Sequence, residues 1–381
     1  MKKKTFFRLS CIILFSVWIN IASANEFSLL GLSPDSDPRV DYLERYITSL
    51  DNNVGKVAYY SSDVTQDDFS IISEKKYDVV LLYRNVLQKA AAAELLLPLD
   101  YHNLLDVDKI NPDWIPSDNL LSYNGELYGV PFYYLAALLS LNSDAAYYSS
   151  FHMPEYPYSW NDLYLACVES DLLLNSNICL MYDNTALPAF VMQYISSQFY
   201  KEGTISFDNS DFRDALTAYA YMVRDGYIID YNEQQDKSAV LYGSSFPIDS
   251  YLYPQVGECQ SVIVDLYALC IPRNSDQLSK AYSYIAEFLT KECQQVIFQG
   301  DWSRMMLMDP SEYSDILIGY YPDYDENMRQ YIVSHWVPRF SNVSYIQYLN
   351  QSGIIRDYIS GKLSMDRLLT ELQATWDSML K

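Results

Sequence analysis

Residues 123–132 read YNGELYGVPF, and this stretch decides how the chain is organised. Asn124-Gly125 is typical of a tight turn between two short extended segments. Gly129 and Pro131 then interrupt an apolar run that continues through residues 132–135. Glycine weakens a strand and proline cannot donate to its hydrogen bonds, so we expect the run to bend. We therefore predict a strand that bends sharply and crosses from one lobe of the protein to another.

Strands and helices alternate on the N-terminal side of this stretch. The run YDVVLLY is continuously apolar, which is typical of a strand buried on both faces of a parallel sheet. Other segments place their apolar side chains at helical spacing. We predict strands at residues 26–32, 57–60 and 77–83, and helices at residues 40–50, 67–73 and 87–96. This alternation predicts an α/β fold with a mainly parallel sheet.

The same mixture of elements continues on the C-terminal side. Ser159 and Asp162 have the spacing of a capping box, which predicts the start of a helix. A second helix would be capped by Asn209 or Ser210 and ended by Gly226. We predict strands at residues 138–142, 239–242 and 262–271, and helices at residues 186–200, 211–225, 278–290, 292–299, 325–334, 345–360 and 364–380.

The N-terminus has the pattern of a signal peptide. Three lysines and Arg8 precede an apolar run at residues 11–22, and Ala22-Ser23-Ala24 is a small-residue cleavage signal. The alternative is an N-terminal membrane anchor, but the run is short and Asn20 interrupts it. Cys11 opens the run rather than following it, so it does not fit a lipid anchor. We predict cleavage after Ala24 and an exported protein, periplasmic or secreted.

The chain is strongly acidic and rich in tyrosine. Its 26 Lys and Arg stand against 49 Asp and Glu, for a net charge of −23. Without the leader, 22 basic and 49 acidic residues leave a net charge of −27. This charge argues against nucleic acids and anionic membranes as partners, although a solvated acidic surface explains it without a cationic ligand. The 37 tyrosines could include rings that stack on flat ligands or sugars.

Five cysteines lie outside the leader, and an exported protein is able to form disulfides. Cys167 with Cys179, and Cys259 with Cys270, are the natural local pairs, which leaves Cys293 over. The alternative is that some or all of them remain reduced as small buried apolar groups. No Cys-x-x-Cys pattern or His/Cys cluster indicates a zinc site.

Several segments resemble, in the same order, those of bacterial extracellular solute-binding proteins of family 1, the receptors that serve ABC transporters. Residues 77–100 resemble the family's buried strand, the helix after it and a leucine-proline-leucine end. Residues 124–142 resemble its first crossover and the next strand. A further segment resembles its proline-x-threonine-tryptophan helix start, with Ser159 in place of threonine. Residues 207–228 resemble its helix that ends in a glycine-tyrosine pair. Residues 268–295 resemble its return strand, the isoleucine-proline-x-asparagine-serine turn and the helix that follows.

The resemblance implies a type II periplasmic-binding-protein fold, in which two α/β lobes joined by hinge crossovers close on a ligand. It implies a monomer without a cofactor that captures a small polar or aromatic solute, most often a carbohydrate, for the membrane permease of an ABC transporter. After a signal peptide at residues 1–24, lobe 1 would comprise residues 25–128 and 265–310, and lobe 2 would comprise residues 129–264 and the C-terminal helices at 311–381.

The candidate ligand contacts are residues at the carboxyl ends of strands, where such clefts are lined. Asp265 is the leading polar candidate, because an acid within the apolar strand VIVDLYALCI is costly unless it is paired or faces the cleft. Arg84 could clamp a carboxylate or phosphate, or form a surface ion pair. The aromatic candidates could instead pack at the hinge. The other candidates are Asp37, Tyr83, Phe132, Tyr133, Tyr134, Tyr242, Ser244, Tyr267, Trp302 and Trp336.

Thiaminase I is the enzymatic alternative, because it resembles these receptors and its first loop resembles residues 33–39. That enzyme uses a cysteine shortly after the crossover proline and a glutamate base. Residues 132–136 (FYYLA) hold no cysteine here, and residues 242–246 (YGSSF) hold no acid. We therefore predict a protein that is not an enzyme. The remaining alternatives are an enzyme or relic of the thiaminase-like fold that binds thiamine- or pyrimidine-type compounds, and a receptor that presents its ligand to a membrane sensor.

Overall fold

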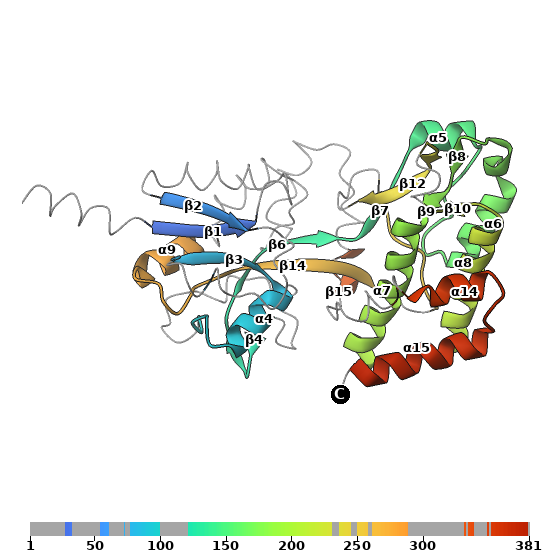
Figure 1. Ribbon diagram of the computed structural model, residues 1–381. Coiled ribbons are helices and arrows are strands. Elements are labelled where there is room, and N and C mark those ends of the chain that lie inside the picture. The colour runs from blue at the N-terminus through green and yellow to red at the C-terminus, as the bar shows by residue number, and fades with distance from the viewer. Residues whose placement is uncertain are drawn as a thin grey trace, which may run out of the picture. The chain divides into compact units, whose positions relative to one another are not determined.

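The computed structural model describes part of the chain, which divides into two compact units (Figure 1). It describes residues 27–32, 54–60, 72, 77–99, 121–230, 236–244, 250–257, 261–288, 331–332, 334–338, 349 and 352–379. Unit 1 comprises Met1–Tyr134 and Leu266–Ile316, and unit 2 comprises Leu135–Asp265 and Leu317–Lys381. Outside the described residues lie the leader, the predicted helices at residues 40–50 and 292–299, most of those at 67–73 and 325–334, Asp37, Trp302, Cys259 and Cys293.

Unit 1 is built on a largely parallel sheet. β1 (Phe27–Leu32) pairs in parallel with β2 (Val54–Tyr60) and with β3 (Val79–Tyr83). The part of β14 (Val262–Cys270) that belongs to unit 1 runs antiparallel to β3. β3 is buried in all but its last residue, as its continuous apolar sequence predicts.

The helix after β3 begins three residues earlier than predicted. α4 (Arg84–Ala92) starts directly at the end of β3 and buries Leu87 and Ala90. Glu94 then has a positive φ of 58°, which takes the backbone out of helical conformation. α9 (Leu278–Phe288) follows β14 in unit 1, close to its predicted position.

The YNGELYGVPF segment forms a hairpin and then a long strand. β4 (Ser122–Tyr123) and β5 (Glu126–Leu127) pair antiparallel. Asn124 and Gly125 between them have φ of 51° and 85°. Two successive positive φ angles are those of the tight hairpin turn that an Asn-Gly pair favours. β6 (Val130–Ala136) follows and carries the chain from unit 1 into unit 2.

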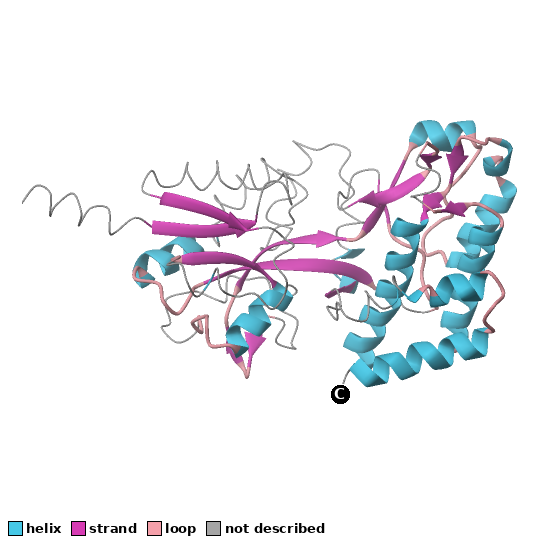
Figure 2. Ribbon diagram, viewed as in Figure 1, coloured by secondary structure: helices cyan, strands magenta, loops and turns pink. Residues whose placement is uncertain are grey.

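Unit 2 consists mainly of helices (Figure 2). Ser159 caps α6, because its Oγ accepts from the Asp162 N–H while Asp162 Oδ2 accepts from the Ser159 N–H at 2.8 Å. This is the capping box that the sequence predicts. Asn209 caps α8 by accepting from the Phe212 N–H at 2.8 Å. The helices described in this unit are α5 (Ser143–Tyr148), α6 (Trp160–Glu169), α7 (Asp183–Glu202), α8 (Ser210–Arg224), α14 (Ile354–Ile359) and α15 (Met365–Met379), with a 3-10 turn at Leu172–Leu174.

Short strands complete unit 2. In one small sheet, β7 (Leu138–Leu141) lies between β12 (Leu241–Ser244) and β13 (Ser250–Tyr251), antiparallel to both. β15 (Trp336–Pro338) pairs in parallel with residues 262–264 of β14. Two parallel pairs join β8 (Ile178–Cys179) to β11 (Ser238–Ala239) and β9 (Met181–Tyr182) to β10 (Ile228–Ile229).

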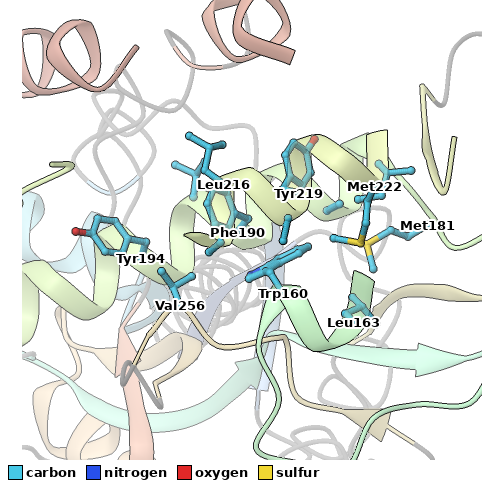
Figure 3. Packing of buried hydrophobic residues seen from close by; sticks show 14 of the residues in the cluster. Trp160, Leu163, Met181, Phe190, Tyr194, Leu216, Tyr219, Met222 and Val256 are labelled. Atoms are coloured by element: carbon cyan, nitrogen blue, oxygen red, sulfur yellow. The ribbon is translucent and has the colours of Figure 1, made fainter. Parts of the chain in front are cut away.

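Three aromatic rings form the centre of the unit 2 core (Figure 3). Trp160 of α6 meets the Phe190 ring of α7 edge-on, with 5.4 Å between ring centroids. Phe190 stacks on Tyr219 of α8 at 5.8 Å. Aromatic pairs of this kind contribute about 0.5–1.5 kcal/mol each beyond the burial of their area. They therefore hold α6, α7 and α8 together.

The structure corrects the predicted disulfides, because Cys167, Cys179 and Cys270 are free, buried thiols. Cys167 packs on the buried face of α6, whereas the Cys179 thiol in β8 faces the Ser238 carbonyl oxygen at 3.9 Å. Cys270 ends an extended strand of nine residues. At about 3.3 Å per residue the two ends of that strand lie about 26 Å apart, so closeness in sequence does not bring the ends of this segment together. The three thiols are the small buried groups of the alternative interpretation.

Candidate functional site

Two predicted aromatic residues meet in unit 1. β14 places Tyr267 directly opposite Tyr83 at the end of β3. Their ring centroids are 5.5 Å apart and the rings are tilted by 47°. Both side chains are half-buried, whereas Leu82 and Ala268, the next residues of the pair of strands, are buried. These two predicted ligand contacts thus form one partly exposed aromatic pair.

Asp265 lies two residues before Tyr267 on the same strand. Asp265 and Tyr267 are the only two positions of β14 that are not fully buried. Successive side chains of a strand point to opposite faces, so residues two apart share a face. The Asp265 carboxylate and the Tyr267 ring therefore lie on one face of β14, with an apolar residue between them in sequence pointing to the other face.

Arg84 is a buried residue and not a surface one. It is the first residue of α4, immediately after Tyr83, and its side chain is 6% exposed. Its Nη1 donates to Asn85 Oδ1 at 3.3 Å. A charged group with so little contact with water is costly unless it is hydrogen-bonded, so the alternative of an exposed surface ion pair does not hold.

The remaining predicted contacts are distributed over both units. Phe132 is buried, with 2% exposure, and Tyr242 is exposed on β12 opposite Ser140. Trp336 does not lie in a loop as predicted but begins β15, opposite Val262. Its side chain is half-buried. For three candidates the structure describes the backbone alone, Tyr133 and Tyr134 in β6 and Ser244 in β12.

An aromatic and polar cluster in unit 2 was missed by the sequence analysis. The Tyr156 and Tyr331 hydroxyls are hydrogen-bonded to each other, and Gln255 Nε2 donates to the Tyr156 hydroxyl at 2.8 Å. The Tyr331 ring stacks on His335 with 4.0 Å between centroids. Burial raises the pKa of both phenols, so both remain protonated at neutral pH. The aromatic-rich YPYSW sequence at residues 156–160 was the one local signal that could have indicated it.

The chemistry of these residues suits the binding of a ligand. Half-buried aromatic rings beside carboxylate, amide and hydroxyl groups suit a solute with apolar faces and polar edges. His335 Nδ1 lies 2.8 Å from Ser334 Oγ and 3.0 Å from the Tyr331 carbonyl oxygen, within its own helical turn. Within the described residues, no three His, Cys, Asp or Glu side chains gather as a metal site would require. None of the helices that the structure describes is both long and apolar enough to cross a membrane.

Comparison with known proteins gives matches among solved structures only. No family model and no curated protein matches the chain. The sugar-binding protein MalE of Xanthomonas citri superposes with a TM-score of 0.68 at 14% identity, covering 93% of this chain and 97% of that one. An ABC substrate-binding protein of Listeria monocytogenes, in complex with cycloalternan, gives 0.67 at 11% identity, with coverage of 93% and 98%. UgpB of Mycobacterium tuberculosis, in complex with glycerophosphocholine, gives 0.64 at 12%, with coverage of 93% and 98%.

The matches extend over nearly the whole of each chain. They confirm the predicted α/β architecture, and they lend no support to the resemblance to thiaminase I. Because the sequence identities are only 11–14%, these matches show the fold alone. This chain has the type II periplasmic-binding-protein fold that is shared by ABC transporter substrate-binding proteins.

Proposed function

We propose that this chain is an exported receptor that captures a small polar solute and delivers it to an ABC transporter. The observation that carries this proposal is the end-to-end match to substrate-binding proteins, over 93% of this chain and 97–98% of theirs. The solutes named for those proteins are sugars and glycerophosphocholine. A carbohydrate is the solute that we propose for this chain.

The chemistry of the candidate residues supports a carbohydrate. A sugar ring has an apolar face that packs on aromatic rings and hydroxyls that donate to carboxylates and amides. Tyr83 and Tyr267 supply an aromatic pair, and Asp265 supplies a carboxylate on the same strand face as Tyr267. Tyr156 and Gln255 supply a hydroxyl and an amide beside a second aromatic cluster.

The rest of the proposal concerns location and partners. The basic and apolar leader with its Ala22-Ser23-Ala24 signal supports export and cleavage after Ala24. The acidic composition is consistent with a monomer that stays soluble outside the cytoplasm and approaches a membrane permease rather than nucleic acid. We propose binding without catalysis, since the proteins with the matching fold are named as binding proteins.

A ligand screen tests this function. The mature chain is mixed with maltose, cycloalternan, glycerophosphocholine or thiamine, and unfolding is followed by thermal shift and titration calorimetry. A ligand at 100 times its dissociation constant stabilises the folded state by about 2.7 kcal/mol, an increase that is easily measured. We expect at least one carbohydrate to raise the melting temperature. The proposal fails if no sugar does so while turnover of any of these compounds is detected.

Variants test the candidate residues. Tyr267→Ala and Asp265→Asn are expected to weaken sugar binding at least tenfold. Tyr147→Ala is the matched control, because that tyrosine is 81% exposed and lies on α5 of unit 2. Equal affinity in all three variants, with intact folding by circular dichroism, would remove Asp265 and Tyr267 from the binding site.

A further inference from the structure

A pocket of about 400 Å³ lies within unit 2, beside the first turn of α6 and along α8. Small-molecule sites in proteins begin at roughly this size. None of the ligand contacts that the sequence predicts is among the described residues that line it. The residues of its walls that matter here are Trp160 and Asn161 of α6, Asp211, Asp214 and Tyr221 of α8, and Gly257.

The pocket is negatively charged. Asp211 and Asp214 are three residues apart on α8 and therefore share a face of the helix. None of the described residues that line the pocket is a lysine, arginine or histidine. Arg213, between the two acids in sequence, is paired with Asp208 and Asp366 at 2.7 and 2.8 Å. The two pocket carboxylates therefore keep their charge available for a ligand.

Gly257 leaves room for the Asp211 carboxylate in the wall of the pocket. A Cβ built on Gly257 would lie 2.0 Å from Asp211 Oδ2, and the φ of Gly257 is 63°. Glycine alone has no Cβ to collide with Asp211, and it adopts a positive φ at little cost. The preceding segment is fixed beside α6, because the Gln255 N–H donates to the Tyr158 carbonyl oxygen at 2.8 Å. The position of Asp211 in this wall therefore depends on Gly257 and on a segment held by a backbone hydrogen bond.

The indole of Trp160 provides a second and independent observation. Trp160 lines the pocket, is 0% exposed, and its Nε1 has no hydrogen-bond partner. Figure 3 shows the nitrogen at the end of the ring that lies nearer Val256, away from Leu163. Val256 stands between the two pocket residues Gln255 and Gly257, so the N–H is directed at that wall. A buried donor without a partner is costly, and a ligand oxygen would satisfy it.

The groups around the pocket specify the chemistry of its ligand. Two carboxylates attract a cation, and the partly exposed ring of Tyr221 could add a cation–π contact. The Trp160 N–H requires an acceptor, which a hydroxyl supplies. We infer that this pocket is a second binding site for a hydroxylated organic cation of amino-sugar size, distinct from the Tyr83–Tyr267 pair of unit 1 and sharing Gln255 with the Tyr156 cluster.

Nuclear magnetic resonance of the tryptophan indoles tests this inference on the mature chain. The Trp160 indole signals are assigned through the proximity of its ring to the Phe190 ring, with 5.4 Å between the two centroids. Glucosamine is the probe, and glucose and gluconate are its neutral and anionic analogues. We expect glucosamine to shift the Trp160 signal at millimolar concentration, glucose to shift it at least tenfold more weakly, and gluconate not to shift it.

Two variants decide whether the shift comes from this pocket. Asp214→Asn, at an exposed position with no described partner, should weaken glucosamine binding at least tenfold. Glu169→Gln removes one exposed carboxylate from the other end of α6 and should leave it unchanged. No Trp160 shift with glucosamine, or an equal shift in Asp214→Asn, overturns the inference. Tyr267→Ala should leave this shift intact, which separates the result from that of the proposed solute site.

Discussion

Gly129, within the YNGELYGVPF segment, offers a sharp test of how unit 1 is packed. It precedes β6, and its φ lies outside the left-handed region, so alanine can adopt its backbone conformation. A Cβ at this position would lie 2.6 Å from Leu87 Cδ1 and 2.9 Å from Ala268 Cβ. It would also lie 3.3 Å from Cys270 Sγ. Gly129→Ala therefore overfills the space between α4 and β14.

The size of the effect follows from which neighbours can move. The end of the Leu87 side chain can rotate, but Leu87 is 0% exposed and has little room. The Ala268 Cβ is fixed to the backbone of β14, so it moves only with the strand. Overpacking costs about 1–3 kcal/mol, and replacing glycine by alanine returns about 0.4–1 kcal/mol by restricting the unfolded chain. We expect a net loss of about 1–2 kcal/mol in the free energy of unfolding.

Hydrogen exchange measured by mass spectrometry locates this loss. A loss of 1–2 kcal/mol should speed the slowest exchange in β3 and in the second half of β14 by a factor of about 5–30. Exchange in α6 and α8 of unit 2 should not change. Adding Leu87→Val should recover part of the loss, because it shortens the side chain that the new methyl group meets. Unchanged exchange in β3 and β14 would refute the close packing of Gly129 on which the reasoning depends.

Three further outcomes are expected. Ser159→Ala removes the side-chain acceptor of the α6 capping box and should lower the free energy of unfolding in urea by about 1 kcal/mol, and a loss below about 0.3 kcal/mol would contradict the role of the cap. Burial raises the pKa of the Cys179 thiol to about 11, so iodoacetamide at pH 8 should label it only after unfolding, and labelling of the native protein would contradict its burial. Burial also raises the pKa of Tyr158 and Tyr219 above the ordinary value near 10. Above pH ~10 the unfolded chain loses these protons while the folded state keeps them. The free energy of unfolding should therefore be unaffected below pH ~10 and fall as the pH rises above it. A constant urea midpoint up to pH ~11 would contradict this.

Local signals account for the parts of the fold that were predicted correctly. The capping pair at Ser159 and Asp162 sets the start of α6, since both hydrogen bonds involve residues within one turn. The Asn124-Gly125 pair sets its hairpin through its own φ angles. The helix after β3 was misplaced by three residues because Arg84, a polar residue, looked like the end of a strand and not like a buried first turn.

Long-range packing accounts for what was missed. The cysteine pairs were chosen by closeness in sequence, but β14 is extended and Cys167 faces a helical core. Trp336 was placed in a loop because a three-residue strand such as β15 has too few residues to show a period of two. Its pairing with β14 joins segments more than 70 residues apart, which one sequence does not reveal.

The two aromatic clusters show how far a prediction from the sequence alone can reach. Asp265 and Tyr267 could be assigned to one face because strand alternation is a local rule, and Tyr83 followed from the end of the neighbouring strand. Tyr156 and Tyr331 are 175 residues apart, and only the packed unit brings their hydroxyls together. A sequence rich in tyrosine therefore predicts which aromatic residues lie together where a strand fixes the direction of their side chains, and it leaves the partner unidentified where a distant helix supplies it.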